Sequence, residues 1–213
     1  VLGHDLRSPL NTILMGAQFI ERGEPLSPGA QRTVERVVGA ARRIERMIGD
    51  LADYSKARFG SGIAVERRPM DLGECVDQLL ADLRTLHVGR ELRVERSGHL
   101  GGEWDRDRIV QTLTNLVNNA VAHGASDRPI VLSLNGAAAD EVVVRVHNEG
   151  APIAPEIMPR LFDAFRRGET HAPGMGLGLF IVRHIARAHR GSVEVESSLE
   201  HGTTFVLRLP RVG

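Results

Sequence analysis

The sequence is poor in several residue types that mark whole classes of protein. Its single cysteine, Cys75, rules out a disulfide within the chain, which fits a reducing compartment, and we interpret it as a small core residue. Its single lysine, Lys56, does not follow a glycine run, so a GxxxxGK[ST] phosphate loop is excluded. No apolar run approaches the ~20 residues of a membrane span, and no signal peptide is recognisable.

Charge of either sign is not in excess. Lys+Arg and Asp+Glu both number 27, so a bulk attraction to nucleic acid or to an anionic membrane is not indicated. The 213 residues, of which 42% are hydrophobic and 25% charged, are ordinary for a soluble globular chain of one large or two small domains. The chain starts inside a helical pattern with no cap before Val1, so we expect it to be part of a longer protein.

Two long amphipathic segments open the chain, at residues 1–23 and 30–58. In both, apolar residues recur every three or four positions, which is typical of a helix-bundle seam. The seam positions are Leu6, Leu10, Ile13, Ala17 and Ile20, then Val34, Val37, Ala41, Ile44, Ile48 and Leu51. A Gly- and Pro-containing turn at 23–29 predicts an antiparallel hairpin. Each helix has further apolar residues off the seam, which a dimeric four-helix bundle would bury.

The pattern changes after the stretch FGSGIAVERR, residues 59–68. We therefore predict a helical domain at 1–59, a linker at 60–68 and a second domain at 69–213. In the second domain the patterns predict helices at 72–86, 105–123 and 177–189, and strands at 91–96, 130–135, 141–148, 192–197 and 203–209. Strands interleaved with helices on one face predict an α/β two-layer sandwich.

The strongest local motif is GMGLGLFIV, residues 174–182. Gly174, Gly176 and Gly178 alternate and lead directly into an apolar helix. Glycines let the backbone approach a ligand, and a helix N-terminus offers N–H groups to anionic oxygen. The same run is also typical of a flexible loop. It is not a dinucleotide fingerprint, because no strand leads straight into it.

A second motif is NLVNNAVAHG, residues 115–124. Asn115 and Asn119 are four apart and share one helix face, where they form either a solvent-facing polar stripe or an oxygen ligand set for Mg²⁺. Asn118 points to another face, so we interpret it as structural. At the start of the chain, HDLRSPLN places His4 beside Asp5, with the helix breaker Pro9 five residues on. A lone His-Asp pair on a helix surface is also typical of a solvated face.

The order of these blocks resembles the catalytic core of sensor histidine kinases over essentially the whole chain. HDLRSPLN resembles the H box, NLVNNA the N box and NEGAPI the G1 box. LFDAF resembles the F box, GMGLGL the G2 box and GTTFVLRLP the family's closing strand. The resemblance implies a helical hairpin that dimerises through 1–59, followed by an ATP-binding sandwich with a lid.

The resemblance also implies the chemistry. The γ-phosphoryl group of ATP would move to His4, with Asp5 as proton acceptor, and then to an aspartate of a response regulator. Asn119 resembles the principal Mg²⁺ ligand, and Asn115 supports it. The family further implies a sensor domain before Val1, and a bacterial cytoplasmic core whose full-length protein can be anchored to a membrane through that missing part. The implied nucleotide contacts are Asn115, Asn119, His123, Asn148, Gly150, Phe165, Arg166, Gly174, Gly176, Leu177, Gly178 and Thr203.

Three positions depart from the family pattern. Asn148 stands where an aspartate usually accepts a hydrogen bond from the adenine amino group, so we expect adenine to bind through the amide oxygen, more weakly and with less discrimination. The lid, 166–173, is short. Ser8 stands where threonine or asparagine usually assists dephosphorylation of the regulator, so we expect weak or no phosphatase activity. For His123 two roles stay open: the side chain stacks on the base, or the residue ends its helix.

Two other functions compete with the kinase. One is a dimeric scaffold that binds nucleotide without transferring phosphate, which the departure at Asn148 favours. The other is an ATP hydrolase of the related gyrase or chaperone type, which uses an acid where Asn115 stands. The absence of that acid and the presence of HDLRSPLN argue against hydrolysis.

Overall fold

The computed structural model describes residues 2–23, 26–60, 62–166 and 175–211, with side chains not described at 2–8, 21 and 22. The chain divides into two compact units, residues 1–56 and 57–213. Each unit is described by itself below. Of the helices in these ranges, none is both long enough and apolar enough to cross a bilayer.

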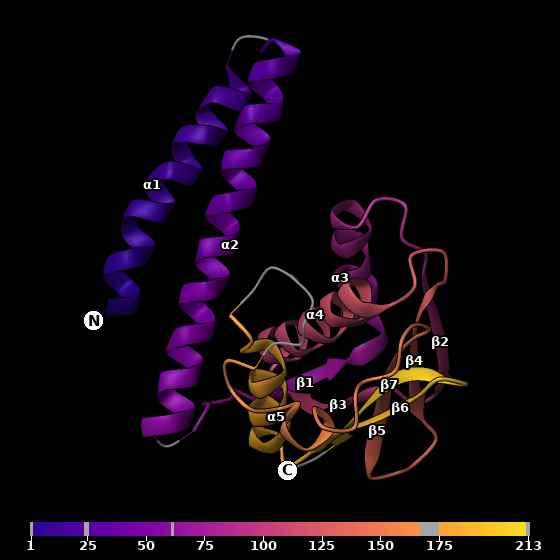
Figure 1. Cartoon of the computed structure of the whole chain (residues 1–213). Coiled ribbons are helices and arrows are strands. Elements are labelled where there is room, and N and C mark those ends of the chain that lie inside the picture. The colour runs from indigo at the N-terminus through magenta and orange to yellow at the C-terminus, as the bar shows by residue number, and fades with distance from the viewer. Residues whose placement is uncertain (1, 24–25, 61, 167–174, 212–213) are drawn as a thin grey trace. The chain divides into compact units, whose positions relative to one another are not determined.

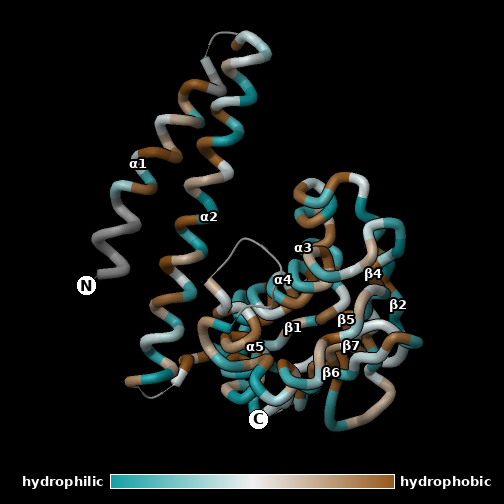
Figure 2. The backbone as a smooth tube through the Cα atoms, viewed as in Figure 1, coloured by the Kyte–Doolittle hydropathy of each residue, from teal (hydrophilic) through white to brown (hydrophobic). Residues whose placement is uncertain are grey.

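The first unit is a helical hairpin. Helix α1 (Leu2–Arg22) continues through Pro9 without a break in its helical assignment, and α2 (Pro28–Phe59) runs back beside it (Figure 1). Apolar residues recur along both helices (Figure 2). The seam is only partly covered, because Leu10, Ala17 and Ala41 are buried whereas other seam residues stay about half exposed. The exposed seam residues are Ile13, Ile20, Val37, Ile44 and Leu51.

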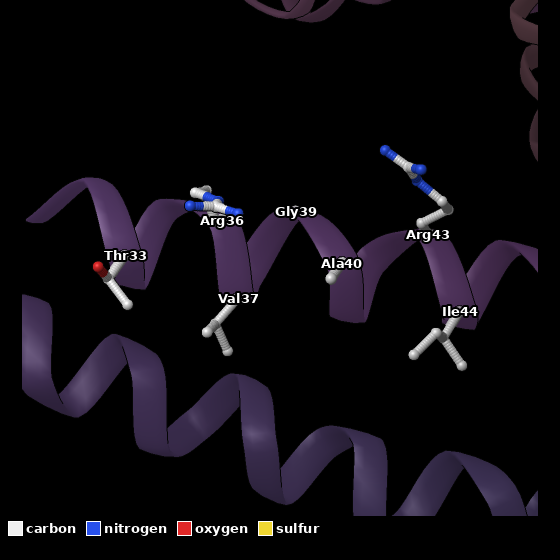
Figure 3. A pocket seen from close by; sticks show the side chains of 7 residues that line it. All are labelled: Thr33, Arg36, Val37, Gly39, Ala40, Arg43 and Ile44. Carbon is white, nitrogen blue, oxygen red and sulfur yellow. The ribbon is translucent and has the colours of Figure 1, made fainter. Parts of the chain in front are cut away.

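A shallow groove along α2 shows how this seam is built. Val37 and Ile44 point toward the neighbouring helix, and Arg36 and Arg43 point away from it (Figure 3). Long arginine side chains on the outer face keep the helix surface polar, and the inner face stays apolar. The groove is lined by α2 alone and borders the seam through Val37 and Ile44.

The second unit is a two-layer α/β sandwich (Figure 1). Its larger sheet has the order β2-β4-β5-β7-β6, in which β2 and β4 are parallel and the other neighbours antiparallel. The strands of this sheet are β2 (Leu92–Gly98), β4 (Ile130–Gly136), β5 (Glu141–Asn148), β6 (Ser192–Ser198) and β7 (Gly202–Pro210). A second, two-stranded sheet pairs β1 (Arg68–Asp71) with β3 (Gly101–Trp104).

Helices cover the larger sheet. They are α3 (Leu72–Leu86), α4 (Arg106–His123) and α5 (Gly178–Ala188), with a short 3₁₀ turn, η1 (Met158–Arg160). The predicted helices and five predicted strands are confirmed. The sequence did not predict β1 and β3, because four residues are too few to show a period-2 pattern.

The core lies between the helices and the sheet. Helix α4 is central: Ile109, Leu113 and Leu116 are completely buried on its inner face, against strand residues such as Val144 and Leu132. Cys75 on α3 is 1% exposed, which confirms its interpretation as a core residue, and burial raises the pKa of its thiol.

Trp104 is the only tryptophan of the chain and is fully buried in this unit. Its indole Nε1–H donates to the carbonyl of Pro210 at 2.7 Å, which ties β3 to the end of β7. Its fluorescence therefore reports the unfolding of the second unit within the whole chain.

Side-chain caps fix where the helices start. Asp71 accepts from the backbone N–H of Glu74 at the start of α3, and Asp105 accepts from that of Arg108 at the start of α4. The other carboxylate oxygen of Asp105 accepts from the N–H of Glu66 at 2.8 Å. The cap thus anchors the incoming chain to α4.

His189 completes this junction. Its Nδ1–H donates to the carbonyl of Ile185 at 2.9 Å, and its Nε2 accepts from the N–H of Asp105 at 3.0 Å. The second bond requires the neutral ring, because Nε2 can accept only when it carries no proton. Burial is the main cause that lowers the pKa of His189, and the charge of Arg67 lowers it further.

Stability should therefore depend on pH through His189. The folded pKa lies below the unfolded one, so acidification below about pH 6.5 makes the unfolded state bind more protons and lowers the free energy of unfolding. His189→Gln, which keeps an acceptor but does not titrate, should flatten this fall. Urea unfolding followed by Trp104 fluorescence between pH 7.5 and 5 checks it. His184, whose pKa is also lowered, is present in both the wild type and the variant. An equal fall of the free energy of unfolding with decreasing pH in the two proteins would therefore contradict the role of His189.

Candidate functional site

The polar face of α4 meets the first turn of α5. The Nδ2 of Asn115 donates to the carbonyl of Gly178 at 3.3 Å. Because the amide nitrogen is engaged, the oxygen of Asn115 is the atom left to bind a cation. Asn119 lies one turn further along the same face and, like Asn115, is half-buried. The two predicted ligands are therefore both partly accessible, and Asn115 contacts the glycine motif.

Asn118 has a different environment. The Nε2–H of His87, at the end of α3, donates to the Oδ1 of Asn118 at 2.9 Å. This bond holds α3 against α4. The structural interpretation of Asn118 is confirmed, and the residue becomes a natural control for its neighbours.

The glycine motif opens α5 without a side-chain cap. Leu177, the residue before the helix, is buried and gives no capping hydrogen bond. The first N–H groups of α5 are therefore left for an external acceptor, and the helix dipole favours an anionic one. This arrangement suits phosphate oxygens.

Backbone contacts hold the F and G2 boxes together. The N–H of Phe165 donates to the carbonyl of Gly176 at 2.9 Å. Gly176 has a φ of +70°, and a Cβ there would lie 2.5 Å from the carbonyl oxygen of Arg166. Only glycine suits both the conformation and the close approach. The segment 167–174, including the predicted contact Gly174, lies outside the described residues.

The two phenylalanines of the F box do different things. Phe162 packs edge to face with Phe205 at 6.3 Å, and the guanidinium of Arg183 lies 5.9 Å above its ring. Phe162 is thus partly buried and packs against the core of the second unit. Phe165 is 52% exposed and has a φ of +60°, which is costly for an aromatic residue, and Arg166 beside it is exposed as well.

The G1 box forms the opposite end of the site. Asn148 ends β5, is 2% exposed, and pairs with Thr203 of β7 in the sheet. Its Nδ2 donates to the carbonyl of Glu149 at 3.4 Å, whereas its Oδ1 is buried without a partner among the described residues. A buried acceptor of this kind needs a donor.

The turn after Asn148 packs tightly on the end of α4. A Cβ on Gly150 would lie 2.8 Å from the carbonyl oxygen of His123, so this position requires a residue without a side chain. His123 is exposed and is the last residue of α4. The helix-ending role predicted as one alternative for His123 is confirmed, and a stacking role stays a prediction.

Thr203 belongs to a hydrogen-bond network that supports the G1 turn. Its hydroxyl lies 2.7 Å from that of Ser197, and Ser197 accepts from the N–H of Ile153 at 2.9 Å. Thr203 is 5% exposed. The structure thus places it in a supporting network beside Asn148. Sequence reasoning missed Ser197, because a lone serine in a strand shows no motif.

The arrangement suits a nucleoside triphosphate with a divalent cation. It offers an uncapped helix end for phosphate, two amide groups for a cation and a buried acceptor for a base amino group. Amide and phosphate oxygens are a donor set that Mg²⁺ accepts. Elsewhere in the described part of the chain, no group of three or more His, Cys, Asp or Glu side chains gathers to bind a metal.

The predicted phosphoacceptor residues lie on the other unit. The backbone of His4, Asp5 and Ser8 falls within α1, and their side chains are outside what the structure describes. Their roles stay predictions.

Family comparison agrees with this site. The chain belongs to the family of histidine kinase-, DNA gyrase B- and HSP90-like ATPases, whose model matches residues 104–213. Residues 1–60 match the His Kinase A phospho-acceptor domain. The two domains together make the chain a histidine kinase catalytic core, and the predicted resemblance is confirmed.

Individual relatives span nearly the whole chain. The bacteriophytochrome of Pseudomonas aeruginosa is 32% identical over 99% of it, and the chain spans 29% of that relative. The structure of full-length ShkA in complex with AMPPNP has a TM-score of 0.76 and 26% identity, over 98% of this chain and 44% of that one. Histidine kinase ThkA in complex with the response regulator TrrA has a TM-score of 0.63 and 25% identity, over 99% of this chain and 60% of that one.

The two glycines beside α5 should respond differently to alanine. Gly176→Ala forces a side chain into a positive φ and against Arg166, so it should lower the free energy of unfolding by about 1–2 kcal/mol. Gly178→Ala is the control, because a Cβ there meets Asn115 at 3.5 Å and α5 gains a better helix former. Urea unfolding followed by Trp104 fluorescence measures both. Equal losses would contradict the geometry.

Proposed function

We propose that this chain transfers the γ-phosphoryl group of ATP to His4 and then to an aspartate of a response regulator. The observation that carries the proposal is the junction of α4 and α5, where the Asn115–Gly178 hydrogen bond sets cation-binding amides beside an uncapped helix N-terminus. Phosphoryl transfer depends chiefly on positioning and charge neutralisation, which such a junction supplies.

In this proposal, different residues bind the base, the phosphates and the cation. Asn148 accepts from the adenine amino group, and Gly176, Leu177 and Gly178 present backbone N–H groups to the phosphates, with Gly174 implied by the motif. Asn119, with Asn115, holds Mg²⁺, which neutralises phosphate charge when it is bound. The residues fit these groups for two reasons. The Oδ1 of Asn148 is buried and has no hydrogen-bond partner among the described residues. The Oδ1 of Asn115 is available because the Nδ2 of the same side chain already donates to Gly178.

The transfer itself uses the first unit. At pH 7 an unperturbed histidine is mostly neutral, so a ring nitrogen of His4 can attack the γ-phosphorus. A bond forms between that nitrogen and phosphorus, and the bond from phosphorus to the bridging oxygen breaks, which releases ADP. The proton of the ring passes to Asp5. His123, Phe165 and Arg166 line the same edge of the nucleotide site in this proposal.

Partners follow from the hairpin and from relatives. The half-exposed seam residues of residues 1–59 support a homodimer, because a second hairpin would cover them. ThkA is known in complex with the response regulator TrrA, which supports a receiver domain as the phosphoryl acceptor here. The chain spans only 29% of the bacteriophytochrome, which supports a sensor domain that precedes it in the full-length protein. A cytoplasmic location of this core is consistent with ATP as its substrate.

The competing proposal is a nucleotide-binding scaffold that transfers no phosphate. Asn148, which lacks the family carboxylate, is the observation that favours it. The intact junction of α4 and α5 favours the kinase.

Labelling with ATP separates the two proposals. The whole chain, incubated with Mg²⁺ and γ-labelled ATP, should gain acid-labile and base-stable label, because phosphohistidine is a phosphoramidate. His4→Ala should gain none. His201→Ala, which changes an exposed histidine in the β6–β7 turn, should label like the wild type. An unlabelled wild type, or label that persists in His4→Ala, would refute the proposal.

A further inference from the structure

Arg90 lies behind the base end of the site and belongs to none of the motifs. It sits in the turn between α3 and β2, where its N–H donates to the carbonyl of His87 at 3.0 Å. Its Nη1–H donates to the carbonyl of Ala125, just after α4. Its Nε and Nη2 are buried and have no hydrogen-bond partner among the described residues. Two charged N–H donors are thus left inside the protein.

These donors lie next to Asn148. A Cβ placed on Gly124 would be 2.7 Å from the Nη2 of Arg90 and 3.1 Å from the Cβ of Asn148. The guanidinium and the Asn148 side chain therefore flank the same backbone atom. The N–H of Ala125 donates to the carbonyl of Glu149 at 2.7 Å, which joins the two segments further. The buried Nη2 of Arg90 and the side chain of Asn148, whose Oδ1 is buried without a partner among the described residues, therefore both lie beside Gly124.

Among the described residues, no carboxylate forms an ion pair with Arg90. The nearest acid in sequence to Asn148 is Glu149, whose carboxylate is half exposed and lies 3.6 Å from Arg128. A buried guanidinium with unused N–H groups is costly, so a group with lone pairs is expected to meet it. An aspartate at 148 would form an ion pair with Arg90. Asparagine leaves both groups available.

We infer that Arg90 and Asn148 together read the adenine base, an inference that rests on the proposed ATP binding. Adenine carries an amino donor at position 6 and ring-nitrogen acceptors on either side of it, N1 and N7. The Oδ1 of Asn148 accepts from the amino group, and Arg90 donates to a flanking ring nitrogen. Hypoxanthine and guanine carry an oxygen at position 6, which would face the Asn148 oxygen. A hydrogen bond from Arg90 to N1 would add to this discrimination, because N1 carries a hydrogen in hypoxanthine and guanine, whereas a bond to N7 would strengthen binding of all three bases.

Binding measurements in which both Arg90 and the base of the nucleotide are changed test this contact. Binding to the whole His4→Ala chain, which cannot turn over, is measured by calorimetry with Mg²⁺ and ATP, 1-deaza-ATP, 7-deaza-ATP or ITP. One deaza analogue and ITP should each bind about tenfold or more weakly than ATP, since a hydrogen bond to a charged group is lost or opposed. In Arg90→Met the difference between ATP and that deaza analogue should vanish.

Arg84→Met is the matched control. Arg84 lies in the last turn of α3 and also donates to a backbone carbonyl, that of Leu92 at 3.4 Å. It should leave the ranking of the nucleotides unchanged. If Arg90→Met weakened ATP and both deaza analogues by one common factor, or if neither analogue bound worse than ATP, the inference would be wrong. If no nucleotide bound at all, the proposed function would fail first, and a nucleotide-binding chain without the Arg90 effect would fail only the inference.

Asn148→Asp gives a second test in which Arg90 stays intact. The new carboxylate should pair with the guanidinium, so the urea midpoint should rise and ATP should bind no more tightly than to the parent His4→Ala chain. In the double variant Asn148→Asp/Arg90→Met the carboxylate is released, and ATP binding should be several-fold tighter than in Asn148→Asp. Tighter ATP binding in Asn148→Asp alone would overturn the coupling of the two residues.

Discussion

The nucleotide site depends on one hydrogen bond, from the Nδ2 of Asn115 to the carbonyl of Gly178. This bond joins α4 to the first turn of α5, and so it places the amides of one helix beside the uncapped N–H groups of the other. Neither helix has a phosphate site alone: α4 offers oxygen ligands, and α5 offers backbone donors. Because the inner face of α4 is buried in the second unit, the site is built on a helix that is part of the core.

The sequence predicted the long elements well, because apolar periodicity over many residues reports which face of a helix or strand is buried. It also singled out Asn115 and Asn119 from their spacing; Asn115 contacts the first turn of α5, and the role of both residues stays a prediction. It missed the four-residue strands β1 and β3, which are too short for a pattern. Arg90 was missed for another reason: it comes near Asn148 only through the folded chain, and no local pattern encodes that proximity.

Among the described residues, unpaired polar atoms and exposed apolar residues indicate where each unit binds another molecule. In the sandwich, the buried Oδ1 of Asn148 and the buried donors of Arg90 call for a ligand with both a donor and an acceptor. In the hairpin, five seam residues, among them Ile13, Val37 and Ile44, are about half exposed, which favours a second hairpin that would cover them. The family departure at position 148 therefore has a physical counterpart in the same pocket.

The affinity of the whole chain for ATP, with and without Mg²⁺, tests the central claim most directly. Asn119→Ala should abolish the gain in affinity that Mg²⁺ provides, and Asn115→Ala should reduce it, since the proposed function assigns both amides to the cation. Asn118→Ala, which loses only its bond to His87, should lower the free energy of unfolding by about 1 kcal/mol and leave Mg²⁺-dependent binding unchanged. Equal Mg²⁺-dependent affinity in all three variants would contradict a nucleotide site at the junction of α4 and α5.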